Sequence, residues 1–475
     1  MNARSRLALA TLLLVAVTAA AGGVGYWFFA RREPAEKEAA ARAKRFLAFE
    51  PAQAVSLRVR AKGEDVRLEK PAGGAWRMTA PVQAVADAKE VEGLLSRLAG
   101  LERRAQSAPA GASAAVLADY GLDAPTARFE IGLAGGKSLS VAIGGDNRFD
   151  GTMFVQPASG EVLVVDGRQR IDLEKNAFEL RERRLLRFEP ADVAAVEVIS
   201  PAGAVALQPQ PPGAQPPGAE GAWRLTAPIH EPADPRRAED LLAALRDLRA
   251  TAFEDGQPPA GKPLYEVTVT LRSGATQRLR AWKAPADPEG PLLLASSEER
   301  SLARAPASAL SALDGGPTPL RDRRVLPGVD REQIAAIRVE RTGAPSFTLA
   351  RKPAGHGLPD LWTLTTAPGA EGKPPAQPAT RQLDTWKAQS LAWALAALEA
   401  DRIVDAAKTP GPITRTYVLL DASHAELGRV AVGTPKAGEV LLQGAGGRVF
   451  AVAADKLAGL ATSPEELEPS KDGAK

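Results

Sequence analysis

One pattern of residues recurs along this chain at a constant spacing, and it constrains the fold more than any other feature. Residues 180–186 (LRERRLL) and residues 320–326 (LRDRRVL) agree closely and lie 140 positions apart. Agreement of this kind across a gap indicates an internal repeat. The chain is therefore expected to use one supersecondary unit several times, and residues 180–186 and 320–326 are expected to connect successive units.

A strand that opens with Trp and closes with Pro appears three times, at residues 76–81 (WRMTAP), 223–228 (WRLTAP) and 362–368 (WTLTTAP). Each copy follows a run in which apolar and polar residues alternate, at residues 55–59, 196–199 and 334–339. Alternation with a period of two is typical of a half-buried strand. The chain is therefore expected to hold three repeats, with boundaries near residues 187 and 326.

An amphipathic helix is predicted after each Trp strand. Its apolar positions have helical spacing, which puts them on one face; they are Val91, Leu94, Leu95, Leu98 and Leu101 in the first repeat, Ala238, Leu241, Leu242, Leu245 and Leu248 in the second, and Ala388, Leu391, Ala392, Leu395 and Leu398 in the third. Asp87 with Glu90 is typical of a capping pair, and Asp234-Pro235 of an N-cap followed by Pro at N1.

Further alternating runs close each unit, and Gly-rich turns separate them as hairpins require. The predicted strands are 128–133, 139–143, 153–155 and 162–165 in the first repeat, 265–271 and 277–282 in the second, and 416–420, 429–432, 440–442 and 449–452 in the third. The expected fold class is α+β, with three tandem repeats that each pair an antiparallel sheet with one covering amphipathic helix.

An N-terminal segment, residues 7–30, is apolar and carries no charge. A helix needs roughly 20 apolar residues to cross a bilayer, so this segment is long enough. It ends in an aromatic group at residues 26–29 and in Arg31-Arg32. Residues 19–21 would suit a cleaved signal peptide, but the apolar run continues beyond them, which favours an uncleaved signal anchor. The basic tail before the segment predicts that the bulk of the chain is extracytoplasmic, in the periplasm.

The predicted organisation follows from these features. It comprises a short basic tail (1–6), a transmembrane signal anchor (7–30), a charged helical stalk (31–48), repeats at 49–187, 188–326 and 327–462, and a polar tail (463–475).

The net charge of +3 belongs to the anchor. Arg4, Arg6, Arg31 and Arg32 flank residues 7–30, and the rest of the chain carries 56 Lys and Arg against 57 Asp and Glu. Nucleic-acid binding needs a concentrated positive footprint, so nucleic acid is not an expected partner. The chain has no Cys, which excludes disulfides, thiol catalysis and thiolate metal sites.

A family resemblance appears at the first repeat. The Trp strand at 76–81, the Asp-capped helix and the Tyr-Gly-Leu-Asp element at 120–123, just before Pro125, resemble domain-of-unknown-function family 4340 over most of the chain outside the anchor. The second and third repeats lack the Tyr-Gly-Leu-Asp element. Members of that family look like membrane-anchored bacterial envelope proteins, often encoded beside ABC-transporter components of the gliding-motility type. The resemblance implies an accessory role outside the cytoplasm and supplies no active-site residues.

Two local motifs have a functional and a structural interpretation. Residues 144–151 (GGDNRFDG) contain acidic residues, but their spacing does not match a calcium loop, and a hairpin loop is the better interpretation. The arginines of the connectors could bind phosphate or lipid head groups. Glu179, Glu182 and Glu189 lie beside the first connector and Asp322 and Asp330 beside the second, which favours internal salt bridges.

Catalytic chemistry has little support. His230, His356 and His424 are far apart and are expected to be exposed in loops or turns, and no nucleophile-elbow or phosphate-loop motif occurs. No cofactor or metal is predicted, and the chain is not expected to be an enzyme.

Trp386 and Trp393 form the most distinctive candidate site. They lie seven residues apart on the third helix and thus on one face. They replace Lys89 and Ser96 of the first repeat, and Arg236 and Ala243 of the second, at positions expected to face solvent. Trp is favoured at interface hot spots, so this face is a candidate partner-binding site. Packing against a neighbouring repeat, or against the long loop before the helix, is the competing interpretation.

Three functional hypotheses remain from the sequence. The first is a membrane-anchored scaffold or interaction protein of a bacterial envelope, accessory to an ABC transporter. The second is an enzyme acting on envelope glycans or lipids through carboxylates. The third is a periplasmic ligand-binding module with a site between repeats.

Overall fold

The structure is a computed structural model, and it describes residues 44–147, 150–210, 223–284, 287–352, 360–366, 381–404 and 409–468. The predicted anchor at 7–30, its basic tail and residues 31–43 of the predicted stalk lie outside these residues. Within the described ranges, no helix has both the length and the apolar character needed to span a bilayer. The chain divides into two compact units, Met1–Arg184 with Arg249–Glu254 and Leu185–Leu248 with Asp255–Lys475.

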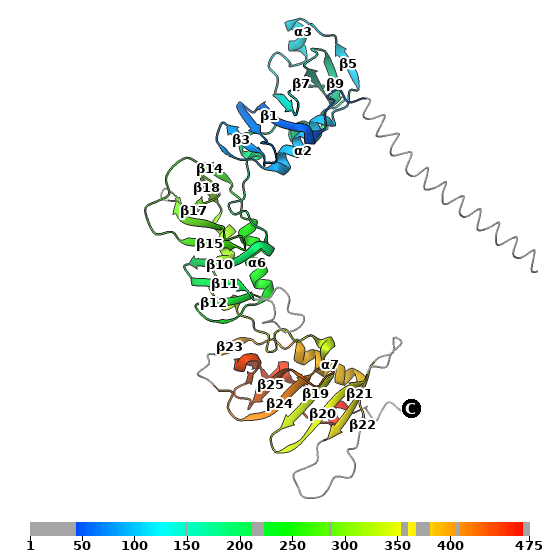
Figure 1. Ribbon diagram of the computed structural model, residues 1–475, viewed down its shortest axis with the longest axis vertical. Helices are drawn as coiled ribbons and strands as arrows, with labels where there is room; N and C mark the ends of the chain where they lie inside the picture. Colours follow the sequence, from blue (N-terminus) through cyan, green and yellow to red (C-terminus); the bar gives the residue numbers. More distant parts are fainter. Residues whose placement is uncertain are drawn as a thin grey trace, which may run out of the picture. The chain divides into compact units, whose positions relative to one another are not determined.

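The protein is mostly sheet, and three nine-stranded antiparallel sheets correspond to the three predicted repeats (Figure 1). The strand orders are β4-β3-β2-β1-β6-β7-β8-β9-β5, β13-β12-β11-β10-β15-β16-β17-β18-β14 and β22-β21-β20-β19-β24-β25-β26-β27-β23. The order is the same in each repeat, which confirms that one unit is used three times. A 12-residue helix follows the strand at one edge of each sheet and leads to the strand at the other edge.

The first repeat contains η1 (Pro51–Gln53), β1 (Ala54–Ala61), β2 (Glu64–Glu69), β3 (Arg77–Ala80), β4 (Ala84–Val85), α2 (Ala88–Ala99), β5 (Ala105–Ala108), α3 (Ala114–Asp119), β6 (Ala127–Leu133), β7 (Ser138–Asn147), β8 (Thr152–Pro157), β9 (Val162–Asp166), η2 (Gly167–Gln169), α4 (Arg170–Leu173) and α5 (Ala177–Leu180).

The second repeat contains η3 (Pro190–Asp192), β10 (Val193–Ser200), β11 (Gly203–Pro209), β12 (Trp223–Ala227), β13 (Glu231–Pro232), α6 (Pro235–Arg246), β14 (Ala252–Glu254), β15 (Tyr265–Leu271), β16 (Thr276–Ala284), β17 (Asp287–Ser296), β18 (Leu302–Ala305), η4 (Ala307–Leu313) and η5 (Thr318–Leu320).

The third repeat contains η6 (Arg331–Gln333), β19 (Ala336–Arg341), β20 (Ala344–Lys352), β21 (Leu361–Thr366), β22 (Arg381–Gln382), α7 (Thr385–Ala396), β23 (Arg402–Val404), β24 (Ile413–Leu420), β25 (Glu426–Gly433), β26 (Glu439–Gln443), η7 (Ala445–Gly447), β27 (Val449–Ala453), η8 (Ala454–Leu457) and η9 (Glu465–Leu467).

The core of each repeat lies between the helix and one face of its sheet. In β1, for example, Leu57 and Val59 are buried while Arg58 and Arg60 point to the other side, as the alternation predicts. All fifteen apolar positions predicted for the three helices are buried. This burial is the main stabilising term, because each fully buried Leu or Val contributes about 2 kcal/mol.

The start of each helix is held by an aspartate. The Asp87 carboxylate accepts hydrogen bonds from the backbone N–H groups of Lys89 and Glu90, and Asp234 caps α6 in the same way, with Pro235 at N1 as predicted. The Glu90 side chain does not return to the cap; its carboxylate lies 3.4 Å from Lys175 Nζ. Each N-cap aspartate also donates its backbone N–H to a leucine carbonyl at the end of its repeat: Asp87 to Leu180, Asp234 to Leu320 and Asp384 to Leu467.

The packed part of the first and third repeats extends beyond the alternating runs. Leu47 is buried in the first core, and Leu467 in the third. Three bridges occupy equivalent places at the start of the repeats: Arg45 with Glu102, Arg184 with Arg249, and Arg324 with Glu399. Residues 44–47 (KRFL) thus correspond to 183–186 (RRLL) and 323–326 (RRVL).

Candidate functional site

The third helix presents two tryptophans on the side turned away from the core. Trp386 is 67% exposed, and its backbone N–H donates to the Asp384 carboxylate at 2.9 Å. Trp393 is half-buried. The two rings meet edge to face, with centroids 6.2 Å apart and planes at 81°. The structure therefore brings the predicted pair together as one aromatic patch, which we call the Trp pair.

One cation contacts the Trp pair, and a second holds the start of its helix. The guanidinium of Arg331, from η6, lies 5.0 Å from the Trp393 ring centroid, a distance at which cation–π attraction operates. Lys387 Nζ donates to the Glu468 carbonyl at 2.9 Å, which ties the start of α7 to the end of the repeat. These contacts hold the backbone and one ring in place and leave the second ring, Trp386, largely exposed.

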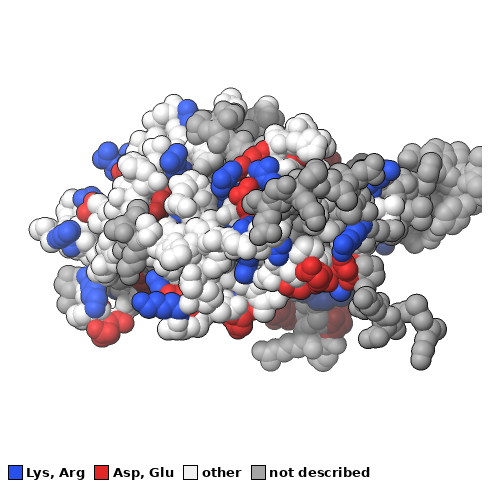
Figure 2. All heavy atoms as spheres, turned by 90° about the horizontal axis from the view of Figure 1, so that it is seen from below, with Lys and Arg blue, Asp and Glu red and all other residues white. Residues whose placement is uncertain are grey.

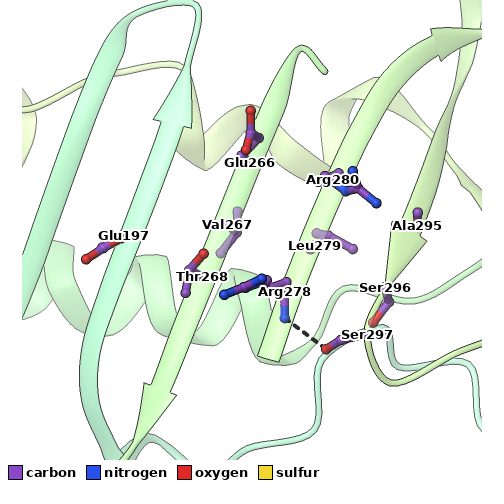
Figure 3. Close-up of a pocket in the computed structure, with 10 residues that line it drawn as sticks. All are labelled: Glu197, Glu266, Val267, Thr268, Arg278, Leu279, Arg280, Ala295, Ser296 and Ser297. Carbon is purple, nitrogen blue, oxygen red and sulfur yellow. Dashed lines mark hydrogen bonds between the residues drawn. The ribbon is translucent and has the colours of Figure 1, made fainter. Parts of the chain in front are cut away.

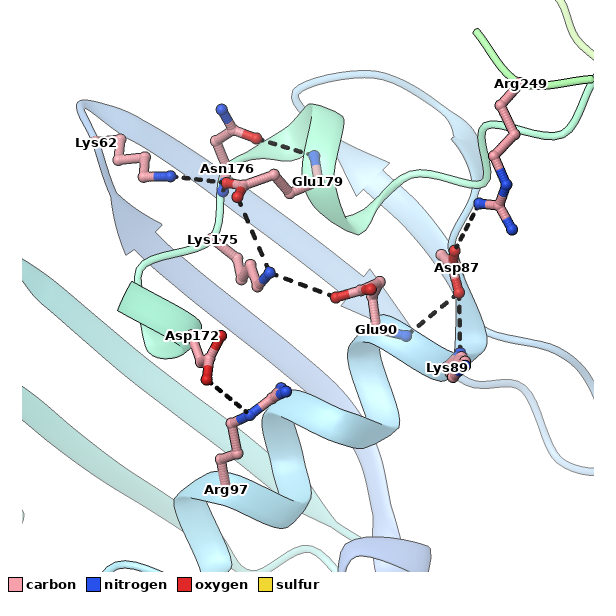
Figure 4. Close-up of polar contacts among 10 residues, drawn as sticks. All are labelled: Lys62, Asp87, Lys89, Glu90, Arg97, Asp172, Lys175, Asn176, Glu179 and Arg249. Atoms are coloured by element: carbon pink, nitrogen blue, oxygen red, sulfur yellow. Dashed lines mark hydrogen bonds and ion pairs between the residues drawn. The ribbon is translucent and has the colours of Figure 1, made fainter. Parts of the chain in front are cut away.

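The equivalent helix of the first repeat is covered by ion pairs (Figure 4). Lys175 pairs with Glu90 at 3.4 Å, and Arg97 pairs with Asp172 at 3.7 Å, so the segment after β9 lies along α2. Lys89 holds the place of Trp386 and is exposed. Charged side chains occur along α2 and α6, whereas α7 (TWKAQSLAWALA) has Lys387 as its one charge.

Ile171 is more exposed than Trp386, at 84%, but it is a single residue on the short helix α4. Isolated apolar side chains are common on soluble surfaces and carry no functional meaning by themselves. The Trp pair differs because two aromatic rings contact each other on one face.

The connector arginines form internal contacts, as predicted, although several partners are unexpected. Arg184 pairs with Glu182 at 2.9 Å and Arg324 with Asp322 at 2.8 Å. Glu179 instead pairs with Lys62, and the Asp330 side chain caps η6. These findings favour the structural interpretation of the connectors.

Arg181 and Arg321 occupy equivalent positions and have different neighbours. Arg181 stacks on the Phe253 ring at 3.7 Å. Arg321 makes a bidentate pair with Glu231 at 2.8 and 2.9 Å, and Arg448 Nη2 lies 3.3 Å from the same carboxylate. Arg448 is mostly buried, and this burial lowers its pKa. Its buried position between the second and third repeats makes it part of the junction.

The Gly-rich motif at 144–151 belongs to a bulged hairpin. Gly144 lies in β7, whose register to β8 shifts after Ile143, and residues 148 and 149 lie outside the described ranges. A Cβ at Gly144 would come within 2.4 Å of the Tyr120 carbonyl, and the Gly145 N–H donates to that carbonyl at 2.7 Å. The Tyr-Gly-Leu-Asp element therefore packs directly against the backbone of these two glycines.

In the first repeat, the sheet face that points away from α2 is its outer face. The Tyr-Gly-Leu-Asp element covers one end of this face. The Tyr120 and Phe154 rings are 4.6 Å apart, and Leu122 is buried among residues of β7 and β9. In the second repeat, Trp282 stands where the first has the bulged glycines; it is 5% exposed and donates to the Gly261 carbonyl at 2.8 Å. The motif considered for calcium is thus a packing site.

The outer sheet face of the second repeat is hollowed into an open cavity of about 570 Å³ on β10, β15, β16 and β17 (Figure 3). Its charged lining residues, on the face turned away from α6, are Glu197, Glu266, Arg278 and Arg280. Ser296, at the rim, donates to the Leu185 carbonyl. A second cavity of about 310 Å³ lies where the second and third repeats meet, lined by Asp234, Arg321, Arg323 and Asp401 among others. Charged side chains line both cavities, whereas small-molecule sites are mostly apolar.

The shifted pKa values of the described ionisable groups share a pattern. A catalytic acid usually has a raised pKa. Among the described residues with a shifted pKa, the carboxyl groups shift downward; Arg58, for example, lowers the pKa of Asp65 to about 2. Burial and a hydrogen bond to Asp314 raise the pKa of Tyr265 to about 12. His230 and His424 are exposed as predicted, and His356 lies outside the described residues. The described part of the chain holds no group of three metal-binding side chains.

The family resemblance is confirmed by two overlapping matches to one family model, at residues 76–268 and 223–414. Each match starts at the Trp strand of one repeat and ends in the central strand, β15 or β24, of the next. No curated protein and no solved structure matches the chain. The two matches together span more than half of the sequence, and the chain therefore belongs to the family described as Domain of unknown function (DUF4340).

Proposed function

We propose that this protein is a membrane-anchored, extracytoplasmic scaffold of a bacterial envelope, accessory to an ABC transporter, that binds a protein partner through the Trp pair. The observation that carries the proposal is the 67% exposure of Trp386, whose ring meets Trp393 edge to face. Repeat architectures commonly present extended binding surfaces, with each unit free to diverge on its outer side. In the third repeat, the outer side of the helix carries two tryptophans where the first repeat has Lys89 and Ser96.

Tryptophan suits a docking surface for a physical reason. A large ring with few rotatable bonds buries much area at low entropic cost, so Trp is enriched among residues that dominate binding energy. The Trp386 ring is already oriented by its contact with Trp393, and Arg331 orients Trp393 in turn. A partner would therefore meet a preorganised surface.

The surface charge favours a protein partner over nucleic acid. Basic and acidic side chains are interspersed on the face drawn in Figure 2. The sequence carries the same balance, since the excess of positive charge comes from the arginines around residues 7–30. Nucleic-acid binding needs positive charge gathered on one side.

Co-purification tests the scaffold proposal. The full chain is extracted from membranes in mild detergent beside a Trp386→Lys variant, which restores the residue type of the first repeat. Lys89→Ala, at the equivalent position of the first repeat, is the matched control. We expect a partner to co-purify with the wild type and the control and to be lost from the Trp386 variant. Wild-type protein that comes out alone would refute the proposal.

The location can be tested separately, because the chain has no Cys. One cysteine is introduced by Ala275→Cys in the exposed β15–β16 turn, and another, in a second variant, by Ser5→Cys in the basic tail. A membrane-impermeant maleimide is added to cells whose outer membrane has been permeabilised. We expect labelling at position 275 and protection at position 5. The opposite pattern would reverse the proposed orientation.

A further inference from the structure

The first repeat carries an open basic cavity at the place where the described chain begins. The cavity has a volume of about 500 Å³ and lies at the end of α2, next to β5 and the end of β9. Its charged and polar lining residues are Lys44, Glu102, Arg103, Arg104, Asp166 and Gln169. The exposed Arg168 pairs with Asp166 at 2.8 Å. We call the surface formed by Lys44, Arg103, Arg104 and Arg168 the proximal face.

Two arginines of the proximal face have no counterpart in the other repeats. The Arg103 N–H donates to the carbonyl of residue 44, and Ala250 and Ala400 make the equivalent bonds in the second and third repeats. Both alanines are buried, at 3% and 2% exposure, whereas Arg103 is exposed. The residue that follows is Arg104 in the first repeat, Thr251 in the second and Asp401 in the third. The pair of consecutive arginines is therefore specific to the first repeat.

In the third repeat, the corresponding place faces the repeat before it. Arg323 and Asp401, which correspond to Lys44 and Arg104, line a cavity together with Arg237 of the second repeat. Among the described residues, only those of the first repeat line the cavity at the proximal face. The proximal face is thus the surface that a later repeat turns toward its predecessor, left open and with two arginines added.

Positive charge exceeds negative charge at the proximal face. Arg104 and Arg168 both pair with Asp166, each at 2.8 Å. In the ranges that the structure describes, the side chains of Lys44 and Arg103 form no ion pair. The other lining carboxylate is at position 102, so four cations stand against two carboxylates. A local excess of this kind attracts an anionic ligand or surface.

The chain enters the first repeat at this face. The described residues begin at Lys44 and the predicted anchor ends at residue 30, so residues 31–43 join the two. A segment of that length spans about 45 Å at most, even when fully extended. Such a short tether gives lipid head groups a high effective concentration at the face. Each Lys or Arg near an anionic bilayer multiplies the affinity about fivefold, so a few cations suffice.

We propose that the proximal face binds the head groups of anionic phospholipids and so holds the first repeat against the membrane that contains the anchor. This inference rests on the proposed location and adds a second membrane contact to it. The head-group phosphate would meet Lys44 and Arg103, whose charges have no carboxylate partner, and charge-assisted hydrogen bonds to phosphate are strong.

Energy transfer between the first repeat and the bilayer tests the inference. The chain has no Cys, so Ser107→Cys, on the exposed strand β5 three residues after Arg104, carries a single donor dye. The full chain is placed in nanodiscs of phosphatidylcholine, alone or mixed equally with phosphatidylglycerol, with an acceptor dye on a lipid head group. We expect higher transfer in the discs that contain phosphatidylglycerol. Equal transfer in both discs would overturn the inference.

Charge variants assign the attraction to the proximal face. Arg103→Ala with Arg104→Thr introduces the residues of the second repeat and should remove most of the lipid-dependent transfer, since two lost charges weaken membrane binding about 25-fold. Arg103→Lys with Arg104→Lys should keep it, because the charge is retained. Arg278→Ala with Arg280→Ala, which removes two exposed arginines of the second repeat, is the matched control. Full lipid dependence in the first variant, or its loss in the lysine variant or the control, would contradict the inference.

Two solution conditions separate head groups from other occupants. About 1 M salt shortens the Debye length to about 3 Å and should abolish the lipid-dependent transfer; transfer that persists would exclude an electrostatic contact and refute the inference. Inorganic phosphate at constant ionic strength should leave the transfer unchanged, because tethered head groups are at a higher effective concentration. Loss of transfer in phosphate would identify a site for soluble anions instead.

The result can be told apart from that for the proposed function. If the maleimide pattern is as expected and a partner co-purifies through Trp386, but transfer does not depend on phosphatidylglycerol, the proposed function stands and this inference fails. If transfer depends on phosphatidylglycerol and no partner co-purifies, the lipid contact stands and the scaffold role fails.

Discussion

The first and second repeats hold the same connector arginine by different means. Arg181 stacks on Phe253, which in turn lies 5.9 Å from the Phe178 ring. Arg321 instead forms an ion pair with the Glu231 carboxylate. Each repeat has only one of the two partners. Ala84 holds the place of Glu231 in the first repeat, and Ile403 holds the place of Phe253 at the second junction. A buried guanidinium needs a partner, and a ring face or a carboxylate can supply it.

The same two repeats also differ on the outer sheet face. In the first, Arg58 is paired with Asp65 at 2.6 Å and with Glu130 at 3.5 Å. In the second, Arg278 and Arg280 line an open cavity, and the described residues include no carboxylate within ion-pair distance of either one. Copies of one fold thus keep their cores and vary the groups that satisfy their surface charges. The following experiments test how far that interpretation holds.

The largest effect is expected from Glu231→Gln. Removing the carboxylate leaves Arg321 and Arg448 beside a neutral group, and breaking a mostly buried pair costs about 3 kcal/mol. Hydrogen–deuterium exchange of residues 320–326 should accelerate strongly, because the Asp322 N–H bonds the Pro232 carbonyl beside this pair. Glu239→Gln, on the exposed side of α6, is the control and should have no effect. Unchanged exchange would show that the ion network does not hold the junction.

Phe253→Ala tests the other half of the comparison. The variant removes the ring under Arg181 together with its contact to Phe178, and the expected local cost is about 2 kcal/mol. Ile403→Ala, the equivalent truncation at the second junction, should cost only about 1 kcal/mol because no cation stacks there. The rate of hydrogen–deuterium exchange at residues 180–184 measures the effect of Phe253→Ala, and the rate at residues 320–324 measures the effect of Ile403→Ala. A larger loss for Ile403→Ala would contradict the division into aromatic and ionic junctions.

The repeats, their Trp strands and the helix faces could be predicted because they depend on local periodicity. The ionic partner of Arg321 could not, since Glu231 lies 90 residues earlier in the chain. The sequence pattern also does not indicate the first strand after each helix. β5 is Ala-Gln-Ser-Ala and β14 has three residues, so neither contains enough alternation to indicate a strand. These strands form because the opposite edge of a completed sheet offers them backbone partners.

The candidate site could be predicted in part. Both tryptophans were expected to face solvent; Trp386 is exposed, as its equivalence with Lys89 predicts, whereas Trp393 is half-buried. The role of Arg331 could not be foreseen, because η6 is distant in sequence from Trp393 and meets it only through the fold. The start of the first repeat was detectable, since residues 44–47 (KRFL) share the basic–aliphatic pattern of the connectors.

Gly144→Ala tests the packing of the Tyr-Gly-Leu-Asp element. A methyl group would meet the Tyr120 carbonyl at 2.4 Å, so the element must move, at a cost of about 1.5 kcal/mol. Chymotrypsin cleavage after Tyr120 should then accelerate roughly tenfold. Gly261→Ala, where a Cβ meets nothing within 4 Å, is the control in the second repeat. Equal cleavage in both variants would mean that this element does not depend on the bulged glycines.

The smallest effect concerns the outer-face ion pair. Arg58 lowers the pKa of Asp65 from 3.8 to about 2, chiefly through their hydrogen bonds. A depressed folded-state pKa contributes stability that is fully present above pH 3.8 and is lost as the pH falls through 2. The Asp65 side chain is 40% exposed, so solvent screening limits the contribution to about 0.5 kcal/mol.

Asp65→Asn should therefore be slightly less stable than the wild type at pH 7 and should match it near pH 2, as measured by urea unfolding at both values. Glu266→Gln in the second repeat should show no such pH-dependent difference, because Glu266 has no ion pair among the described residues. A comparable response from both variants would mean that the paired face of the first repeat and the open face of the second differ in geometry but not in energy. The cavity of the second repeat would then have no excess of unsatisfied charge to offer a ligand.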